Sequence, residues 1–129
     1  MAVGFPYATG DILTAADMNG MVAFTINAQP GGTYTLASTD QYQVLIGMSN
    51  ASAKTVYIPT DATYNFPIGT AITILNTGAA AATITATTSG TTTVVSAGAT
   101  PASPTVAQYK MAVAIKTSAN SWVVAGAVA

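Results

Sequence analysis

Apolar and polar residues alternate with a period of two in several stretches of this chain after its first twenty residues. Between residues 71 and 75, Ile72 and Ile74 fall on one face and Thr73 on the other, and Thr83-Ile84-Thr85 repeats the pattern. Such alternation is typical of a β-strand that buries one face. Together with the turn residues that bound such runs, it predicts strands over residues 22–27, 33–36, 43–48, 54–58, 71–76, 82–87, 91–95, 107–116 and 121–127.

Turn-forming residues separate the predicted strands. Gln29-Pro30-Gly31-Gly32 and Ser118-Ala119-Asn120 are two of these breaks, and residues of these types favour turns. No helical pattern lies between the strands, whereas parallel strands are normally connected by a crossover helix. The sequence therefore predicts an all-β fold, an antiparallel β-sandwich or barrel of the jelly-roll type. The Ala- and Thr-rich run 79–100 is expected to form strands too, because Thr and Val favour β-structure.

Two segments supply candidate core residues. In the predicted strand 107–116, the large apolar side chains alternate with Lys110, two alanines and Lys116. We therefore expect the large side chains to share one buried face and the lysine face to be solvated. The predicted residues of the core and the closing hairpin are Ile72, Ile74, Tyr109, Met111, Val113, Ile115 and Trp122.

The first twenty residues follow a different pattern. Thr14 can cap a helix, Asp17 lies three residues later as a capping-box partner, and Asn19-Gly20 supplies a stop. A helix of about two turns is too short to be stable alone. We therefore divide the chain into an attachment segment, residues 1–20, and a β-domain, residues 21–129. The predicted attachment residues are Phe5, Pro6, Tyr7, Ile12 and Leu13.

The composition argues against catalysis. Only 5% of the residues are charged, 50% are hydrophobic, and the chain has no His and no Cys, which removes most catalytic acids, bases and nucleophiles. The remaining acids are Asp11, Asp17, Asp40 and Asp61, and capping or turn positions explain Asp17, Asp40 and Asp61. We expect no enzymatic activity, no cofactor and no metal site, since an enzyme would need two of these carboxylates to converge in a pocket.

Charge and hydropathy also limit the partners. The formal net charge is −1, and no basic cluster is present, so nucleic acid and charged membrane are poor partners. No apolar run reaches the roughly 18 residues that a membrane span needs. A weakly charged surface favours oligomerisation instead. Six Tyr and one Trp leave glycan binding open, although Tyr57, Tyr109 and Trp122 fall within predicted strands, where core or subunit packing is the better interpretation.

Two parts of the chain resemble small structural proteins of tailed bacteriophages. The stretch Gly10-Asp11-Ile12-Leu13-Thr14-Ala15-Ala16-Asp17-Met18-Asn19 resembles the opening of many such proteins. The body is similar to a β-domain of phage minor tail, fibre and head-decoration proteins, through residues 56–59, 66–74, 109–116 and 120–126. In such domains, a loop with the pattern Phe-Pro-x-Gly-Thr enters a buried strand and a closing hairpin ends in Trp-x-x-x-Gly. The resemblance implies that Gly69 permits the loop's turn and that Trp122 packs across the hairpin.

The same resemblance implies a role in assembly of a virion, commonly as a homotrimer whose function resides in its interfaces. The leading expectation is an accessory protein that decorates or stabilises the capsid exterior and contacts the major capsid protein. The alternatives are a small tail-fibre, tail-tip or adaptor protein bound to tail proteins, and a glycan-binding module that contacts the host surface. The expected location is the outer surface of the capsid, or the tail, after synthesis in the host cytoplasm.

Overall fold

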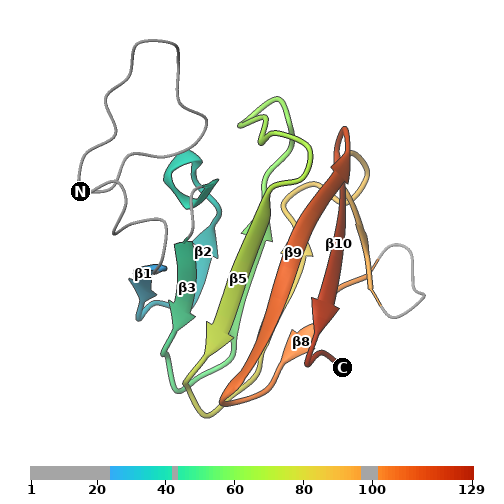
Figure 1. Cartoon of the computed structure of the whole chain (residues 1–129). Coiled ribbons are helices and arrows are strands. Elements are labelled where there is room, and N and C mark those ends of the chain that lie inside the picture. Colours follow the sequence, from blue (N-terminus) through green and yellow to red (C-terminus); the bar gives the residue numbers. More distant parts are fainter. Residues whose placement is uncertain (1–23, 42–43, 97–101) are drawn as a thin grey trace, which may run out of the picture.

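The computed structural model describes residues 24–41, 44–96 and 102–129, and within them two β-sheets and one short 3-10 helix, η1 (Ser38–Gln41). The six-stranded sheet has the order β1-β3-β5-β9-β10-β7, and the four-stranded sheet has the order β2-β4-β6-β8. Figure 1 shows the four-stranded sheet behind the six-stranded one. The strands are β1 (Thr25–Gln29), β2 (Thr33–Thr35), β3 (Val44–Met48), β4 (Lys54–Ile58), β5 (Ala71–Asn76), β6 (Ala82–Ala86), β7 (Thr93–Val95), β8 (Thr105–Val106), β9 (Lys110–Ser118) and β10 (Ser121–Gly126).

From β1 to β6 the chain passes back and forth between the two sheets. Each strand lies beside the strand two places earlier and runs parallel to it, so β3 joins β1, β4 joins β2, β5 joins β3 and β6 joins β4. The C-terminal part then completes both sheets. The hairpin β9–β10 lies between β5 and β7, and β8 pairs with β6.

The prediction of a β-rich fold is confirmed, but the prediction of antiparallel pairing is wrong for most pairs. Among the described residues, five pairs are parallel (β1–β3, β3–β5, β2–β4, β4–β6 and β7–β10) and three are antiparallel. Helices are the usual crossover between parallel strands. Here a strand of the opposite sheet makes the crossover instead, as β2 does between β1 and β3.

The strand positions agree closely with the alternation in the sequence. β4 and β5 have the predicted bounds, and the Ala- and Thr-rich run contains β6 and β7 as expected. The short strand β8 was not predicted, because two residues carry no periodicity. The whole predicted attachment segment, including Phe5, Pro6, Tyr7, Ile12 and Leu13, lies outside the described residues.

One hydrophobic cluster lies between the sheets and takes side chains from both. Ile72, Ile74 and Trp122 belong to it, as predicted. In the six-stranded sheet the register places Ile46 beside Ile74, and in the four-stranded sheet it places Val56 beside Ile84. Strand pairing in register therefore stacks the apolar residues of successive strands into one core.

β9 turns the opposite face to the core from the one predicted. The buried residues of this strand are Ala112, Ala114 and Lys116. Tyr109, Met111 and Ile115 are exposed by 75%, 49% and 37%, and Val113 is half-buried. The prediction that these four large residues form the core is therefore wrong.

Neighbouring strands explain this inversion. The pairing register places Ala114 between Ile72 of β5 and Val124 of β10, and it places Ala112 beside Ile74. Because these larger neighbours fill the core, the positions on β9 require small side chains. Side-chain size on one strand therefore did not decide which of its faces is buried.

Candidate assembly surface

The loop with the pattern Phe-Pro-x-Gly-Thr fastens β5 to the closing hairpin. Gly69 has a φ of 96°, which favours glycine, and its N–H donates to the Lys116 carbonyl oxygen at 2.8 Å. The Thr70 hydroxyl donates to the Pro67 carbonyl oxygen at 2.7 Å. The Phe66 ring packs edge-to-face on the Trp122 ring, with the two ring centroids 5.5 Å apart. These residues thus join the loop to the hairpin core.

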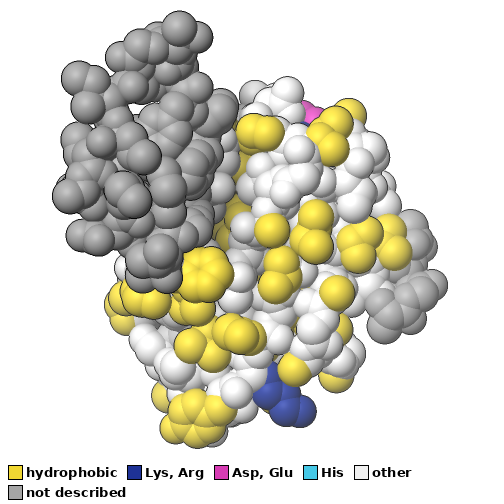
Figure 2. Space-filling view, viewed as in Figure 1, with side chains coloured by type: hydrophobic (Ala, Val, Ile, Leu, Met, Phe, Trp, Pro, Cys, Tyr) yellow, Lys and Arg dark blue, Asp and Glu magenta, His cyan; other side chains and the backbone are white. Residues whose placement is uncertain are grey.

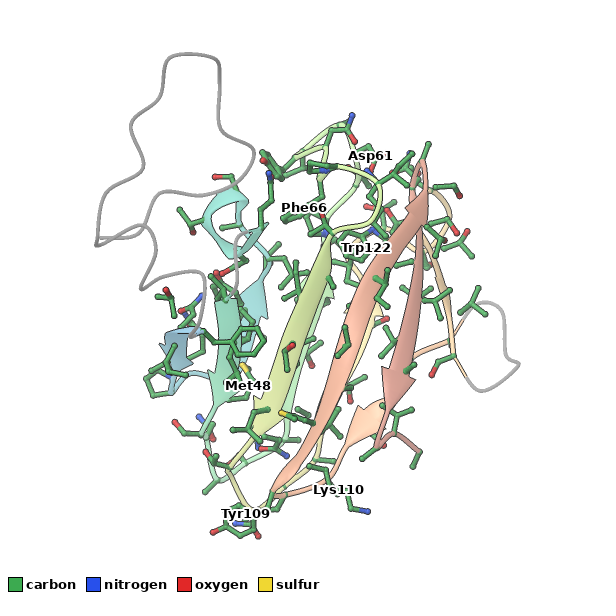
Figure 3. The ribbon with its side chains drawn as sticks, viewed as in Figure 1. Met48, Asp61, Phe66, Tyr109, Lys110 and Trp122 are labelled. Carbon is green, nitrogen blue, oxygen red and sulfur yellow. The ribbon has the colours of Figure 1, made fainter. Side chains whose placement is uncertain are left out.

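A buried ion pair ties the same loop to β9. Lys116 Nζ donates to Asp61 Oδ1 at 2.8 Å, to Asn65 Oδ1 at 2.7 Å and to the Phe66 carbonyl oxygen at 2.7 Å. The second Asp61 oxygen accepts the backbone N–H of Asn120 at 2.9 Å. Burial acts to raise the pKa of Asp61, but the bonds from Lys116 and Asn120 outweigh it, so this pKa is lowered. Figure 3 shows Asp61, Phe66 and Trp122 together at one end of the sheets.

The ammonium group of Lys54 is buried between two other loops. Its side chain is buried, and Nζ donates to the Asn50 carbonyl oxygen at 2.7 Å and to the Ala80 carbonyl oxygen at 2.6 Å. Burial lowers the pKa of Lys54 because it penalises the charged form. Gly78 completes this region, since a Cβ there would lie 1.9 Å from the Asn50 oxygen. The ammonium group thereby holds the β3–β4 and β5–β6 loops together.

Asp40 is the third buried charge. It accepts hydrogen bonds from the Tyr34 hydroxyl at 2.6 Å, the Asn27 side-chain amide at 2.9 Å and the Ala37 backbone N–H at 2.8 Å. Burial, together with the bond to Asp40 and its charge, raises the pKa of Tyr34 to about 12. Asp40 and Asp61 thus belong to separate hydrogen-bond networks, each of which supports local structure.

These networks leave little charge on the surface. Asp40, Lys54 and Lys116 are buried, and Asp61 is half-buried and paired. Within the described part of the chain, Lys110 is therefore the one charged side chain that is fully exposed. Asp11 and Asp17 lie outside that part.

The outward side of the six-stranded sheet is apolar. Its register places Ile26, Leu45, Thr73, Val113 and Ala125 in one row across five strands. Figure 2 views this side and shows hydrophobic side chains spread over it, and Lys110, labelled in Figure 3, lies at its lower margin. We call this surface the apolar outer face, and its residues are Ile26, Ala28, Leu45, Gly47, Ala71, Thr73, Leu75, Val95, Met111, Val113, Ile115, Val123 and Ala125.

The outward side of the four-stranded sheet carries hydroxyl groups instead. Pairing places Thr33, Thr55, Thr83 and Thr105 in one row across all four strands. A second row contains Thr35, Tyr57 and Thr85. We call this surface the threonine face. The two sheets therefore share one core but present chemically different outer surfaces.

Most of the described tyrosines are half-buried and not free to bind a glycan. Tyr34 and Tyr64 use their hydroxyls in internal hydrogen bonds, to Asp40 and Gln41. Tyr57 is half-buried on the threonine face. Tyr109 is the exposed tyrosine of the described chain, and it has a φ of 61° at the turn before β9. The described tyrosines thus contribute one fully exposed ring, at a turn.

Comparison with protein-family models, with curated proteins and with solved structures finds no match to this chain. The described residues also contain no helix that is long and apolar enough to cross a membrane.

Sequence reasoning missed three features of the structure. It did not find the apolar outer face, because the alternation in residues 107–116 predicts Met111 and Ile115 in the core. It did not find the Lys54 site, whose ligands are backbone carbonyls that leave no mark in a sequence. The threonine face, in contrast, had a signal, since Thr alternates with apolar residues around Ile84.

Proposed function

We propose that this chain is a non-enzymatic structural protein of a tailed-phage virion, a trimeric accessory protein that decorates or stabilises the capsid exterior. The observation that carries this proposal is the distribution of charge. All the charged side chains of the described chain except Lys110 are buried or half-buried and hold local structure together, and the outward side of the six-stranded sheet is apolar, with Lys110 at its margin. Large exposed apolar patches are typical of interaction sites.

The stretches that resemble phage β-domains support the proposal because they make contacts that connect elements of this fold. The loop from Phe66 to Thr70 joins β5 to β9, and Trp122 packs against Phe66 inside the hairpin end of the core. As part of the proposal, we treat the two sheets as the halves of a β-sandwich, because both supply one core.

Two other functions compete with capsid decoration. A tail-fibre, tail-tip or adaptor protein would use the same uncharged surface, but a long fibre requires a repeated shaft, which this sequence lacks. Glycan binding has weaker support, because sugar sites usually combine aromatic rings with polar groups in a concave site. Tyr109 is a single exposed ring at a turn.

Locating the protein in intact particles tests the proposal. An epitope tag on the chain, detected by immunogold labelling or by cryo-electron microscopy of purified virions, should mark the capsid surface in a regular array. Labelling at the tail would favour the tail-protein alternative. Absence of the protein from purified particles would overturn the virion role altogether.

A further inference from the structure

We infer that the apolar outer face is the contact between copies of this chain, so that its occupant is a second copy. The inference deepens the proposed function, which requires that copies associate, but it concerns the purified protein and does not depend on where that protein acts. Three observations carry it: the neutrality of the face, its size and the glycine on β3.

The face is neutral and apolar, which suits contact with itself. No charged side chain occurs among its residues, and Lys110 lies at its margin. Two identical neutral faces can meet without desolvating charge or opposing like charges. Interfaces between permanent partners of one kind are also more apolar than contacts between proteins that exist separately. The composition therefore favours a second copy over a transient partner.

The size of the face reaches the lower limit expected of a biological contact. Six strands about 4.8 Å apart and roughly six residues long at about 3.3 Å each span a plane of about 500 Å². Two such planes together bury about 1,000 Å², which is about the area that a biological interface should exceed. Side-chain relief increases the accessible area above that of the plane. Three copies with these faces turned toward a common axis would cover all of them, as the proposed trimer requires.

Gly47 is the third observation. It is the fourth of the five residues of β3 and pairs with Ala28 of β1 and Leu75 of β5. A Cβ added there would meet its nearest atoms, the Asn27 carbonyl oxygen and Ile26 Cγ2, at 4.0 Å, which is ordinary contact. None of the described residues of the same copy therefore requires glycine here, and glycine weakens a strand interior. Close approach of another chain gives this glycine a role.

Matched substitutions on the two outer surfaces test the inference. Met111→Lys and Ile115→Lys place a charge on the apolar outer face at positions that one copy leaves exposed. Thr55→Lys and Thr83→Lys place the same charge on the threonine face. Size-exclusion chromatography with light scattering at micromolar concentration should show an oligomer for the wild type. The first pair should raise the dissociation constant about tenfold or more, and the second pair should leave it unchanged.

Gly47→Val keeps the test decisive if a lysine variant fails to fold. Valine favours a strand, so each copy should retain its β-structure by circular dichroism while the oligomer dissociates.

Because the chain has no Cys, cross-linking of single introduced cysteines measures the contact directly. Ala28→Cys should cross-link copies through a short bismaleimide, whereas Thr55→Cys should not.

The outcomes separate the two proposals. A monomeric wild type, or equal effects of substitutions on both surfaces, would overturn the assignment of the apolar outer face. A dimer that the Met111 and Ile115 substitutions dissociate would uphold this face and overturn only the trimer. Absence from virions would overturn the proposed function and leave the contact between copies intact.

Discussion

Replacing Asp61 with Asn should destabilise the protein strongly, because it leaves the Lys116 ammonium buried without a counter-charge. Lys116 is 1% exposed and would keep only neutral acceptors, the side chain of Asn65, the carbonyl oxygen of Phe66 and the amide oxygen of the substituted residue. Removing one partner of a buried ion pair costs about 3 to 5 kcal/mol. The Asp61 side chain is 18% exposed, which softens the loss, so we expect about 3 kcal/mol.

The opposite truncation should cost much less. Lys116→Met fills a similar volume with an apolar chain and leaves Asp61 with the Asn120 N–H and partial contact with solvent. We expect a smaller loss than for Asp61→Asn, because the Asp61 side chain is 18% exposed and can be solvated when its partner is removed, whereas Lys116 is 1% exposed. Lys116→Met should stabilise the Asp61→Asn background, in which it removes an unpaired buried charge, although it destabilises the wild type; replacement of both charged partners is often close to neutral.

Urea unfolding of the two single variants and the double variant, at one fixed protomer concentration, measures this cycle. A loss of 3 kcal/mol corresponds to a fall of roughly 10 °C in Tm for a domain of this size. The pKa of Asp61 is lowered below its ordinary 3.8, so its contribution is complete above that pH and disappears as pH falls through the folded-state pKa. Asp61→Asn should abolish this acid-dependent loss. Equal unfolding free energies for the wild type and Asp61→Asn, or a greater loss for Lys116→Met, would refute the reasoning.

Four further outcomes are expected. Burial lowers the pKa of Lys54, so the unfolded chain binds more protons between that pKa and 10.5, and Tm should rise with pH in this window for the wild type but not for Lys54→Met. Gly78→Ala should cost about 2 kcal/mol or more in unfolding free energy because its Cβ collides with the Asn50 oxygen, whereas Gly90→Ala, with nothing within 4 Å, should be nearly neutral. Sodium chloride should release little protein from particles, since apolar contacts are weakly screened; detachment at modest salt would contradict this. Deleting residues 1–20 should leave a soluble, cooperatively melting β-domain that no longer binds particles, and normal binding by the truncated protein would place the anchor elsewhere.

Much of the secondary structure was predictable from the sequence because the pattern that identifies a strand lies within the strand itself. Thr and Ile alternate through β5 and β6, and turn residues delimit them. The direction of pairing was not predictable in this way. Whether β3 pairs with β1 or with a hairpin neighbour depends on where the intervening residues lie in space. A crossover made by a strand has the same local pattern as any other strand.

The burial of β9 shows the same limit at the level of side chains. Its alternation correctly defines two faces, but the choice between them depends on β5 and β10, which place Ile72 and Val124 on either side of Ala114. Lys116 adds a second non-local reason. Its buried position requires Asp61, which is far away in sequence and enters the site through a loop.

Charge burial and the apolar outer face have one origin in this chain. Two of its three basic residues, Lys54 and Lys116, lie inside the domain. There they connect loops that are distant in sequence. Disulfides make such connections in many small domains, but this chain has no Cys and cannot form them. Lysines placed inside are lost from the surface, and within the described part of the six-stranded sheet Lys110, at the margin, is the one exposed charge. In our proposal, the outer side of this sheet is covered by another copy of the chain, whose face matches it in polarity and size.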